Sequence, residues 1–533
     1  MSSSFFTSTR WRTWGVWLLP CLLLVLAALR PLALPDEGRY AEVGRWMALS
    51  GDWLTPRLDG IPFFHKPPLL YWFEAAAMTA LGASPWVARL VVILHACLML
   101  GLMVVVCTRH IAGADVARRA AWIFGSSLAF LIGGQYVNHD MMVATWMGVA
   151  IWCFARALLH DAGVHAGWAR WGFVACALGV LSKGLIGLLL PGFVLFVWVA
   201  YTWQWRKILA LPWVSGVLLF VVIALPWFVL AAREHPDMLA YMFGKHQFGR
   251  YTATTFNNAR PWWFYGLAIT VLMFPWVFVV ATDGVHRLRA ALVRTPSSTT
   301  AGIDTRWVSL CWIWIVAILG FFSIPNSKLV GYALPVMPPL AVLSALWWQH
   351  HVAPRAWGRL LFGALVMMNV GLAVLAQVEA VRYTAQRSTM DVAEVLACAA
   401  NRSDVVAAVD DYPYDLPFYA QLTHPVEVIQ DWETLRQTAG DNWRRELFEG
   451  SDFDAEAARS LVPLSRLEAL KQVPRAWVLA PNTSALLNAQ SHAGFTLVAT
   501  GQAWRLFRSS LAFESPETAE QKGLRGCKHQ SQK

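Results

Sequence analysis

The sequence is poor in charged residues and has no Cys-x-x-Cys motif. Only 14% of its 533 residues are Asp, Glu, Lys or Arg, whereas an ordinary soluble protein has roughly 25%. This shortage excludes both a typical soluble enzyme and a disordered chain, which needs high charge and low hydrophobicity. The 8 cysteines form no Cys-x-x-Cys pair. Most lie in or at the ends of apolar stretches, so we expect no disulfide or metal framework.

Hydrophobic residues are abundant instead, at 57% of the chain, with 30 Trp. A membrane-spanning helix needs roughly 17–25 apolar residues, and about eleven stretches approach or reach that length. They predict a polytopic α-helical membrane protein. The stretches are residues 14–34, 86–108, 120–137, 141–159, 171–182, 185–203, 212–232, 263–282, 307–323, 329–348 and 360–377.

The net charge of +10 comes largely from short loops between these stretches. Basic residues mark the cytoplasmic side of a membrane protein, so this charge indicates topology and not nucleic-acid binding. The first stretch follows Arg10 and Arg12 as a signal peptide would, but no Ala-x-Ala site follows it, which favours an uncleaved helix. The loops over residues 35–85 and 233–262 are then expected to face outward.

Domain organisation follows from the same pattern. Residues 1–377 are expected to form the transmembrane domain, residues 378–513 a small outward-facing α/β domain, and residues 514–533 a disordered tail. In the α/β domain we expect strands at Val405 to Val409, Val426 to Ile429, Ala476 to Leu479 and Ala503 to Phe507, and a helix from Ala455 to Leu470.

The outward loops carry more cations than topology predicts. An anionic lipid headgroup or a lipid-linked phosphate would be their natural partner. The alternative for any single cation is to snorkel or to pair with a nearby Glu. The cations are Arg39, Arg45, Arg57, Lys66, Lys183, Arg233, Lys245, Arg250, Arg260 and Lys328.

The first outward loop opens with Asp36. Tyr40, Val43 and Met47 recur at helical spacing while Glu42 and Arg45 point elsewhere, which predicts an amphipathic helix on the membrane surface. Asp36 stands at its expected N-cap. It is either a cap alone or a carboxylate that orients or deprotonates an acceptor.

Other outward groups are expected at the same membrane level. Pro67 and Pro68 hold Lys66 before a second amphipathic helix, and Asp140 begins a span. Acids and cations at one depth also suit the ion pathway of a transporter. Mid-membrane carboxylates and internal repeats, which such transporters tend to have, are not evident. His95 and His110 are interpreted as packing or surface histidines.

These motifs resemble the bacterial aminoarabinose lipid A transferases, relatives of the protein O-mannosyltransferases with the C-type glycosyltransferase fold of about 11–13 transmembrane helices. The resemblance covers residues 14 to 350. It rests on Asp36-Glu37-x-Arg39-Tyr40-x-Glu42, Ser50-Gly51-Asp52-Trp53, Lys66-Pro67-Pro68-Leu69, Asp140, Leu181-Ser182-Lys183-Gly184, Pro226-Trp227, Pro261-Trp262-Trp263 and Ser327-Lys328-Leu329 with Tyr332 and Pro335.

The resemblance implies a sugar donor on undecaprenyl phosphate and inverting transfer. Asp36 matches the essential carboxylate of the family and Asp140 a second acidic position. Lys66 and Lys183 match lysines near the lipid phosphate, where fixed cations would stabilise developing charge. Further phosphate-binding candidates are Arg39 and Lys328, and weaker substrate-positioning candidates are Glu37, Glu42, Tyr40, His65, Arg57 and Tyr332.

The expected acceptor is lipid A phosphate at the periplasmic face of the bacterial inner membrane. No cofactor or metal is implied, although Asp36, Glu37 and Asp140 would be the ligands if a divalent cation were needed. Many family members carry Glu where this chain has His65, so hexose or hexosamine donors remain alternatives to an aminopentose. Transfer to a protein or glycan hydroxyl is the second hypothesis, and a flippase for a lipid-linked sugar is the hypothesis from another class.

Overall fold

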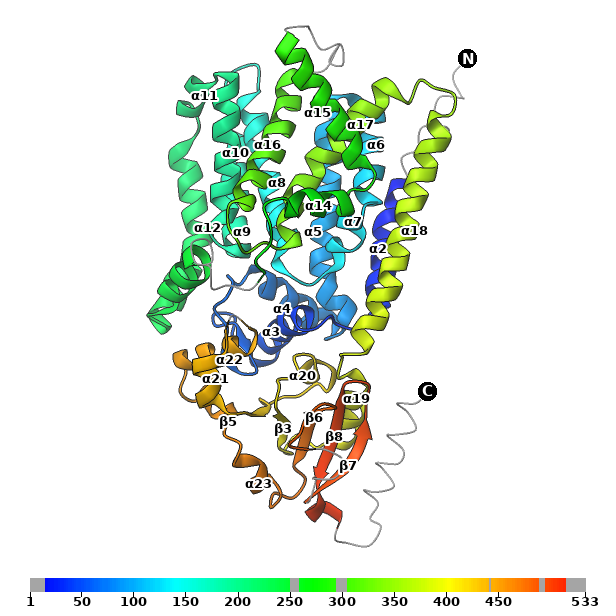
Figure 1. Cartoon of the computed structure of the whole chain (residues 1–533). Helices are drawn as coiled ribbons and strands as arrows, with labels where there is room; N and C mark the ends of the chain where they lie inside the picture. Colours follow the sequence, from blue (N-terminus) through cyan, green and yellow to red (C-terminus); the bar gives the residue numbers. More distant parts are fainter. Residues whose placement is uncertain (1–14, 250–257, 294–303, 441, 488–493, 514–533) are drawn as a thin grey trace. The chain divides into compact units, whose positions relative to one another are not determined.

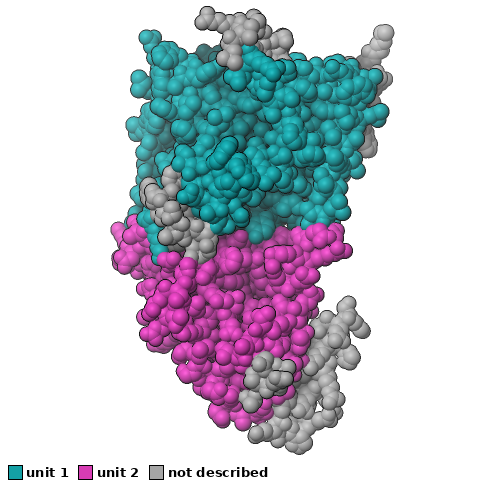
Figure 2. All heavy atoms as spheres, viewed as in Figure 1, with its two compact units in different colours: residues 1–28, 89–230, 243–377 teal, residues 29–88, 231–242, 378–533 magenta. Residues whose placement is uncertain are grey.

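A computed structural model of the chain describes residues 15–249, 258–293, 304–440, 442–487 and 494–513. The predicted disordered tail, residues 514–533, lies outside the described residues, as does Arg250. The chain divides into two compact units (Figure 2). The first unit comprises residues 1–28, 89–230 and 243–377, and the second comprises residues 29–88, 231–242 and 378–533.

In its described part, the first unit consists of helices joined by loops, with one isolated β-bridge between Ala259 and Ser327 (Figure 1). Six helical stretches are long and apolar enough to cross a membrane, and the apolar helices Gly15–Ala28 and Ile186–Thr202 are shorter. The chain is therefore a multi-pass membrane protein. The helices that lie wholly or mainly in this unit are α2 (Leu18–Ala28), α5 (Pro85–Val106), α6 (Gly113–Gly125), α7 (Leu128–Leu131), α8 (His139–Leu158), α9 (Ala166–Lys183), α10 (Ile186–Thr202), α11 (Trp205–Leu209), α12 (Trp213–Glu234), α14 (Phe264–Leu272), α15 (Trp276–Val293), α16 (Thr305–Ser323), α17 (Met337–His351) and α18 (Gly358–Ala385).

Two of the predicted spans are not continuous helices. The stretch 120–137 is interrupted after Gly125, because the Ser127 side chain accepts a hydrogen bond from the backbone N–H of Phe130 and so caps a new short helix, α7. The stretch 263–282 is divided into α14 and α15 around Pro275, which has no N–H to continue a helix. Hydropathy alone does not register either interruption.

Helices α9 and α10 form a tight hairpin. Gly179 and Gly187 face one another so closely that a Cβ on Gly179 would lie 3.0 Å from Gly187 Cα, and a Cβ on Gly187 would clash with the Gly179 backbone. Small residues at a helix crossing let the backbones approach in this way. The hairpin turns at Gly184, whose φ is +83°. Lys183 is consequently fixed at the end of α9.

The second unit begins with the outward loop of residues 35–85. Helix α3 (Asp36–Ser50) packs against α4 (Leu69–Leu81), and a hairpin of β1 (Arg57–Leu58) and β2 (Ile61–Pro62) lies between them in the chain. Gly44 lets the two helices meet, because a Cβ there would lie 2.6 Å from Glu74 Cβ.

Two expectations for α3 were wrong. Glu42 and Arg45 are both buried, and they pair with each other, so α3 does not present them to solvent. Asp36 is the first helical residue and not the N-cap, since Pro35 occupies that position without a side-chain hydrogen bond. Near the start of α3 it is the Glu37 side chain that accepts a hydrogen bond from a backbone N–H, that of Ala33, at 2.8 Å.

The rest of the second unit is an α/β structure around one six-stranded sheet. The strand order is β5-β4-β3-β6-β8-β7. Strands β5, β4, β3 and β6 are parallel to one another, β8 is antiparallel to β6, and β7 is antiparallel to β8. The strands are β3 (Val406–Val409), β4 (Glu427–Ile429), β5 (Leu461–Val462), β6 (Trp477–Pro481), β7 (Phe495–Thr500) and β8 (Trp504–Ser509). The helices are α19 (Met390–Ala399), α20 (Leu416–Tyr419), α21 (Trp432–Thr438), α22 (Arg444–Gly450) and α23 (Arg466–Leu470).

The four strands predicted from sequence coincide with β3, β4, β6 and β8, whereas β5 and β7 were missed. The predicted helix from Ala455 to Leu470 was wrong, because the chain forms β5 in its middle and Pro463 follows that strand. The absence of disulfides was also wrongly predicted. Cys398 in α19 is disulfide-bonded, while six cysteines in the first unit are free.

Candidate functional site

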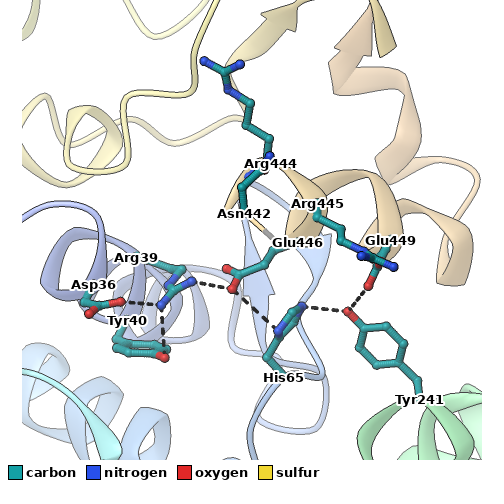
Figure 3. Close-up of polar contacts among 10 residues, drawn as sticks. All are labelled: Asp36, Arg39, Tyr40, His65, Tyr241, Asn442, Arg444, Arg445, Glu446 and Glu449. Carbon is teal, nitrogen blue, oxygen red and sulfur yellow. Dashed lines mark hydrogen bonds and ion pairs between the residues drawn. The ribbon is translucent and has the colours of Figure 1, made fainter. Parts of the chain in front are cut away.

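In the second unit, the predicted catalytic carboxylate lies beside a buried arginine. Arg39 follows Asp36 by one helical turn on α3, and its Nη2 donates to Asp36 Oδ1 at 2.5 Å and to the Tyr40 hydroxyl at 3.2 Å (Figure 3). The Asp36 side chain is 40% exposed, whereas that of Arg39 is only 5% exposed. Arg39 therefore fixes an accessible carboxylate in one orientation.

The other arm of the Arg39 guanidinium reaches the α/β part of the unit. Its Nη1 donates to Oε1 of Glu446 on α22. Burial raises the pKa of the Glu446 carboxyl, and the positive charges of Arg39 and Lys66 oppose that rise. Lys66 is thus close enough to act on the same carboxylate.

His65 extends this arrangement to a second carboxylate (Figure 3). Its ring stacks on Phe63 at 5.0 Å, its Nδ1 lies 3.6 Å from Glu446 Oε1, and its Nε2 lies 2.7 Å from the Tyr241 hydroxyl. Tyr241 donates to Glu449 Oε2 at 2.9 Å. We call the set formed by Asp36, Arg39, Glu446, His65, Tyr241 and Glu449 the Arg39 network.

The remaining predicted residues of this unit have partners of their own. Glu37 is buried and accepts two hydrogen bonds from Arg30, at 2.5 and 2.9 Å. Glu42 accepts two bonds from Arg45, both at 2.7 Å. Arg57 donates to the Gly60 carbonyl at 2.9 Å and to Asp454 at 2.8 Å.

In the first unit, three predicted residues meet at the start of α8. Lys183 pairs with Asp140, and both side chains are about nine-tenths buried. Asp140 also accepts from the Asn138 side-chain amide at 3.0 Å, and the Lys183 ammonium lies 4.6 Å from the centroid of the Tyr332 ring. We call Asp140, Lys183 and Tyr332 the Lys183 cluster.

A glycine makes room for this cluster. Any Cβ at Gly331, the residue before Tyr332, would clash with the Asp140 carboxylate. Lys328, three residues earlier, is used differently, because its ammonium donates to the backbone carbonyls of Arg260 at 3.0 Å and Pro325 at 2.5 Å. In the structure Lys328 therefore ties two loop segments together.

The two groups present distinct chemistry. The Arg39 network offers an exposed carboxylate backed by a guanidinium, which suits orienting a hydroxyl, amine or phosphate. The Lys183 cluster offers a buried cation beside a carboxylate and an aromatic face, which suits an anionic group. Among the residues that the structure describes, no three His, Cys, Asp or Glu side chains are grouped as a metal site would require.

Sequence reasoning missed Glu446, Glu449 and Tyr241. Glu446 and Glu449 lie three residues apart on one face of α22, and this spacing was the available signal. Nothing in the sequence connected that face to Arg39, which is 407 residues away in the chain.

Residues 22–242 match the family model described as dolichyl-phosphate-mannose-protein mannosyltransferase. An undecaprenyl phosphate-alpha-4-amino-4-deoxy-L-arabinose arabinosyl transferase of Sodalis glossinidius is 31% identical over 341 residues, which are 62% of this chain and 58% of that protein. Its counterpart in Pseudomonas paraeruginosa is 28% identical, over 69% of this chain and 65% of that protein. The chain thus spans about three fifths of the length of such relatives, and the resemblance inferred from the motifs is confirmed.

Solved structures extend the likeness to nearly the whole chain. The crystal structure of ArnT from Cupriavidus metallidurans bound to undecaprenyl phosphate aligns with a TM-score of 0.78 at 23% identity, covering 96% of this chain and 100% of that one. The archaeal oligosaccharyltransferase AglB from Archaeoglobus fulgidus aligns with a TM-score of 0.51 at 14% identity, covering 89% of this chain and 70% of that one. The chain has the C-type glycosyltransferase fold, as the resemblance implied.

Proposed function

We propose that this chain, a relative of the aminoarabinose transferases within the wider protein mannosyltransferase family, is a membrane glycosyltransferase that moves aminoarabinose from undecaprenyl phosphate to lipid A. The observation that carries the proposal is the 31% identity over 341 residues to an enzyme named for that donor. The similarity of fold to a relative crystallised with undecaprenyl phosphate supports it.

In this reaction the cations act on the lipid phosphate. Lys183 is held by Asp140 beside Tyr332, so a cation is ready before the donor arrives. As the sugar leaves, negative charge develops on the lipid phosphate, and a preorganised ammonium stabilises it without reorganisation. Lys66 is the second proposed phosphate ligand, and Arg39 and Lys328 are the further candidates that the sequence offers.

Asp36 is the proposed catalytic carboxylate. An acceptor phosphate is nucleophilic at neutral pH and needs no general base, so Asp36 positions donor or acceptor when lipid A phosphate is used. Arg39 keeps the carboxylate oriented through its hydrogen bond to Oδ1. Single in-line attack inverts the sugar carbon.

The site is proposed to face the periplasm, with residues 1–377 in the bacterial inner membrane and residues 378–513 outside it. The distribution of basic loops supports this orientation. The disulfide at Cys398 also supports it, because disulfides persist in the periplasm and are rare in the cytosol.

A hydroxyl acceptor on a protein or glycan is a second candidate function. The match to the protein mannosyltransferase model over residues 22–242 favours it. In that reaction Asp36 serves as the general base, since a hydroxyl must lose a proton as it attacks.

The experiment that tests catalysis uses the purified chain in detergent, undecaprenyl phosphate-linked aminoarabinose and lipid A. We expect stoichiometric formation of glycosylated lipid A and undecaprenyl phosphate, unaffected by a chelator. The isosteric Asp36→Asn should lose transfer but remain folded, while Glu433→Gln, an exposed carboxylate on α21, should stay active. No turnover of donor by the wild-type chain would contradict the proposal and favour a flippase.

A further inference from the structure

The two carboxylate oxygens of Glu446 differ in their hydrogen bonding. Oε1 accepts from Arg39 and faces His65. Oε2 is buried and has no hydrogen-bond partner among the residues that the structure describes. Burying a carboxylate oxygen without a hydrogen-bond donor costs free energy, because the oxygen loses its hydration and no hydrogen bond compensates for it. Such an oxygen is suited to a donor that arrives with a ligand.

The neighbouring histidine, when neutral, does not neutralise this carboxylate. Tyr241 has a single hydroxyl proton and donates it to Glu449. The Tyr241 oxygen then accepts from His65 Nε2–H, which leaves the lone pair of Nδ1 on the Glu446 side of a neutral ring. Arg39 meanwhile shares its one positive charge between Asp36 and Glu446. Lys66 also acts on this carboxylate, but neither Arg39 nor Lys66 donates to Oε2, so this oxygen can still accept from a further cation.

The position of Glu446 in the fold is also that of a ligand-binding residue. Helix α22 follows β4 and α21 in the chain. Arg444 pairs with Asp411, which follows β3, so α22 begins near the carboxyl end of a parallel strand, where ligands of open α/β sheets characteristically bind. Arg445 and Glu449 of the same helix lie near Glu446 (Figure 3). The pair of Arg444 with Asp411 joins α22 to the segment after β3 and so helps to hold Glu446 in place.

We propose that Oε2 of Glu446 binds the protonated amino group of the donor sugar and makes Glu446 the residue that selects an amino sugar. The inference rests on the proposed function, because it needs a donor that carries an amine. An ammonium brings three N–H donors and a positive charge to the buried carboxylate. A hydroxyl at the same carbon brings one donor and no charge, so the site discriminates against it.

The test compares two donors, undecaprenyl phosphate-linked aminoarabinose and the analogue with a hydroxyl in place of the amine. We expect the wild-type kcat/KM to favour the amino donor by roughly 10- to 100-fold, the range of a charged hydrogen bond. Glu446→Gln keeps an oxygen for Arg39 but replaces Oε2 by an NH₂ group, which repels an ammonium. This variant should raise KM for the amino donor, leave KM for the hydroxyl donor within about twofold, and bring the two kcat/KM values together.

Controls separate this inference from the function on which it rests. Glu433→Gln should keep the wild-type preference. Glu446→Asp, which retains the charge on a shorter arm, should keep a preference for the amino donor even if Glu446→Gln does not fold. An unchanged preference in Glu446→Gln, or an equal loss on both donors in Glu446→Asp, would overturn the assignment. Wild-type turnover of neither donor would instead overturn the proposed function.

Discussion

At the scale of single residues, Asp140 and Lys183 combine stability with chemistry. Both are buried, so removing one partner leaves the other charge or its polar replacement without compensation. Breaking such a pair costs about 3–5 kcal/mol, whereas replacing both members often costs far less. Asp140→Asn and Lys183→Met should therefore each lower the Tm in detergent, and the double variant should melt closer to the wild type.

None of these three variants should transfer sugar, because the cation or its anchor is gone in each. Asp115→Asn, which breaks an exposed pair with Arg118, is the matched control and should change the Tm little. A double variant whose loss of stability equals the sum of the single losses would show that Asp140 and Lys183 do not stabilise each other.

A second residue-scale prediction concerns the pH dependence of stability. Asp59 is buried in the turn between β1 and β2, and burial raises the pKa of its carboxyl to about 8, with the nearby Glu42 adding to the rise. The unfolded chain ionises this group near its ordinary value of 3.8, so between about pH 4 and 8 the folded state binds the extra proton. Stability should fall as pH rises through this window, by up to about 1.4 kcal/mol per pH unit.

Asp59→Asn should remove that slope. Asparagine tolerates the left-handed conformation at this position, where φ is 55°, and keeps an oxygen for the Val426 N–H. Melting temperatures measured from pH 5 to 8 should fall less steeply for Asp59→Asn than for the wild type and for Glu433→Gln. Parallel curves for all three would mean that Asp59 is ionised throughout.

At the scale of secondary-structure elements, the α9–α10 hairpin depends on one close approach. Gly187→Ala would place a methyl group into the backbone of Gly179 and push the helices apart. Overpacking of this kind costs about 1–3 kcal/mol. We expect a lower Tm and weaker donor binding, because Lys183 ends α9. Gly192→Ala on the same helix meets nothing within 4 Å and is the control. Equal melting temperatures for the two variants would contradict the packing argument.

The elements also show what hydropathy and periodicity can predict. Long apolar helices such as α5 and α12 were located closely, because composition alone identifies a span. The sequence located helix α3 but did not predict that it is buried. Glu42 and Arg45 indicate a solvent-exposed polar face unless it is known that they pair with each other. The short strands β5 and β7 escaped prediction because their pattern is set by neighbours in the sheet.

At the scale of the whole molecule, the second unit is assembled from distant parts of the chain. The outward loop is tied to the α/β part through Arg39 with Glu446, Arg57 with Asp454, and Asp59 with the Val426 N–H. These contacts join residues more than 360 positions apart, so no local sequence pattern predicts them. The motifs predicted Asp36, Lys66 and Lys183 as site residues, whereas Glu446 becomes a candidate only from its contacts in the folded chain.

This assembly predicts that the loop depends on the α/β part. A chain that ends at residue 377 should expose the loop to trypsin at Arg57, because Asp454 is missing, while the full chain resists cleavage there. Asp454→Asn should give an intermediate rate, since it removes one contact only. Equal resistance of all three chains, measured by mass spectrometry of the fragments, would show that residues 35–85 are ordered without the rest of their unit.

The most direct test of the account is mass spectrometry of lipid A from cells with this gene, without it, and with Asp36→Asn in its place, under conditions that induce envelope modification. The account predicts lipid A that carries the mass of one aminopentose in the first strain and lacks it in the other two. An unchanged lipid A profile in all three strains would contradict lipid A as the acceptor.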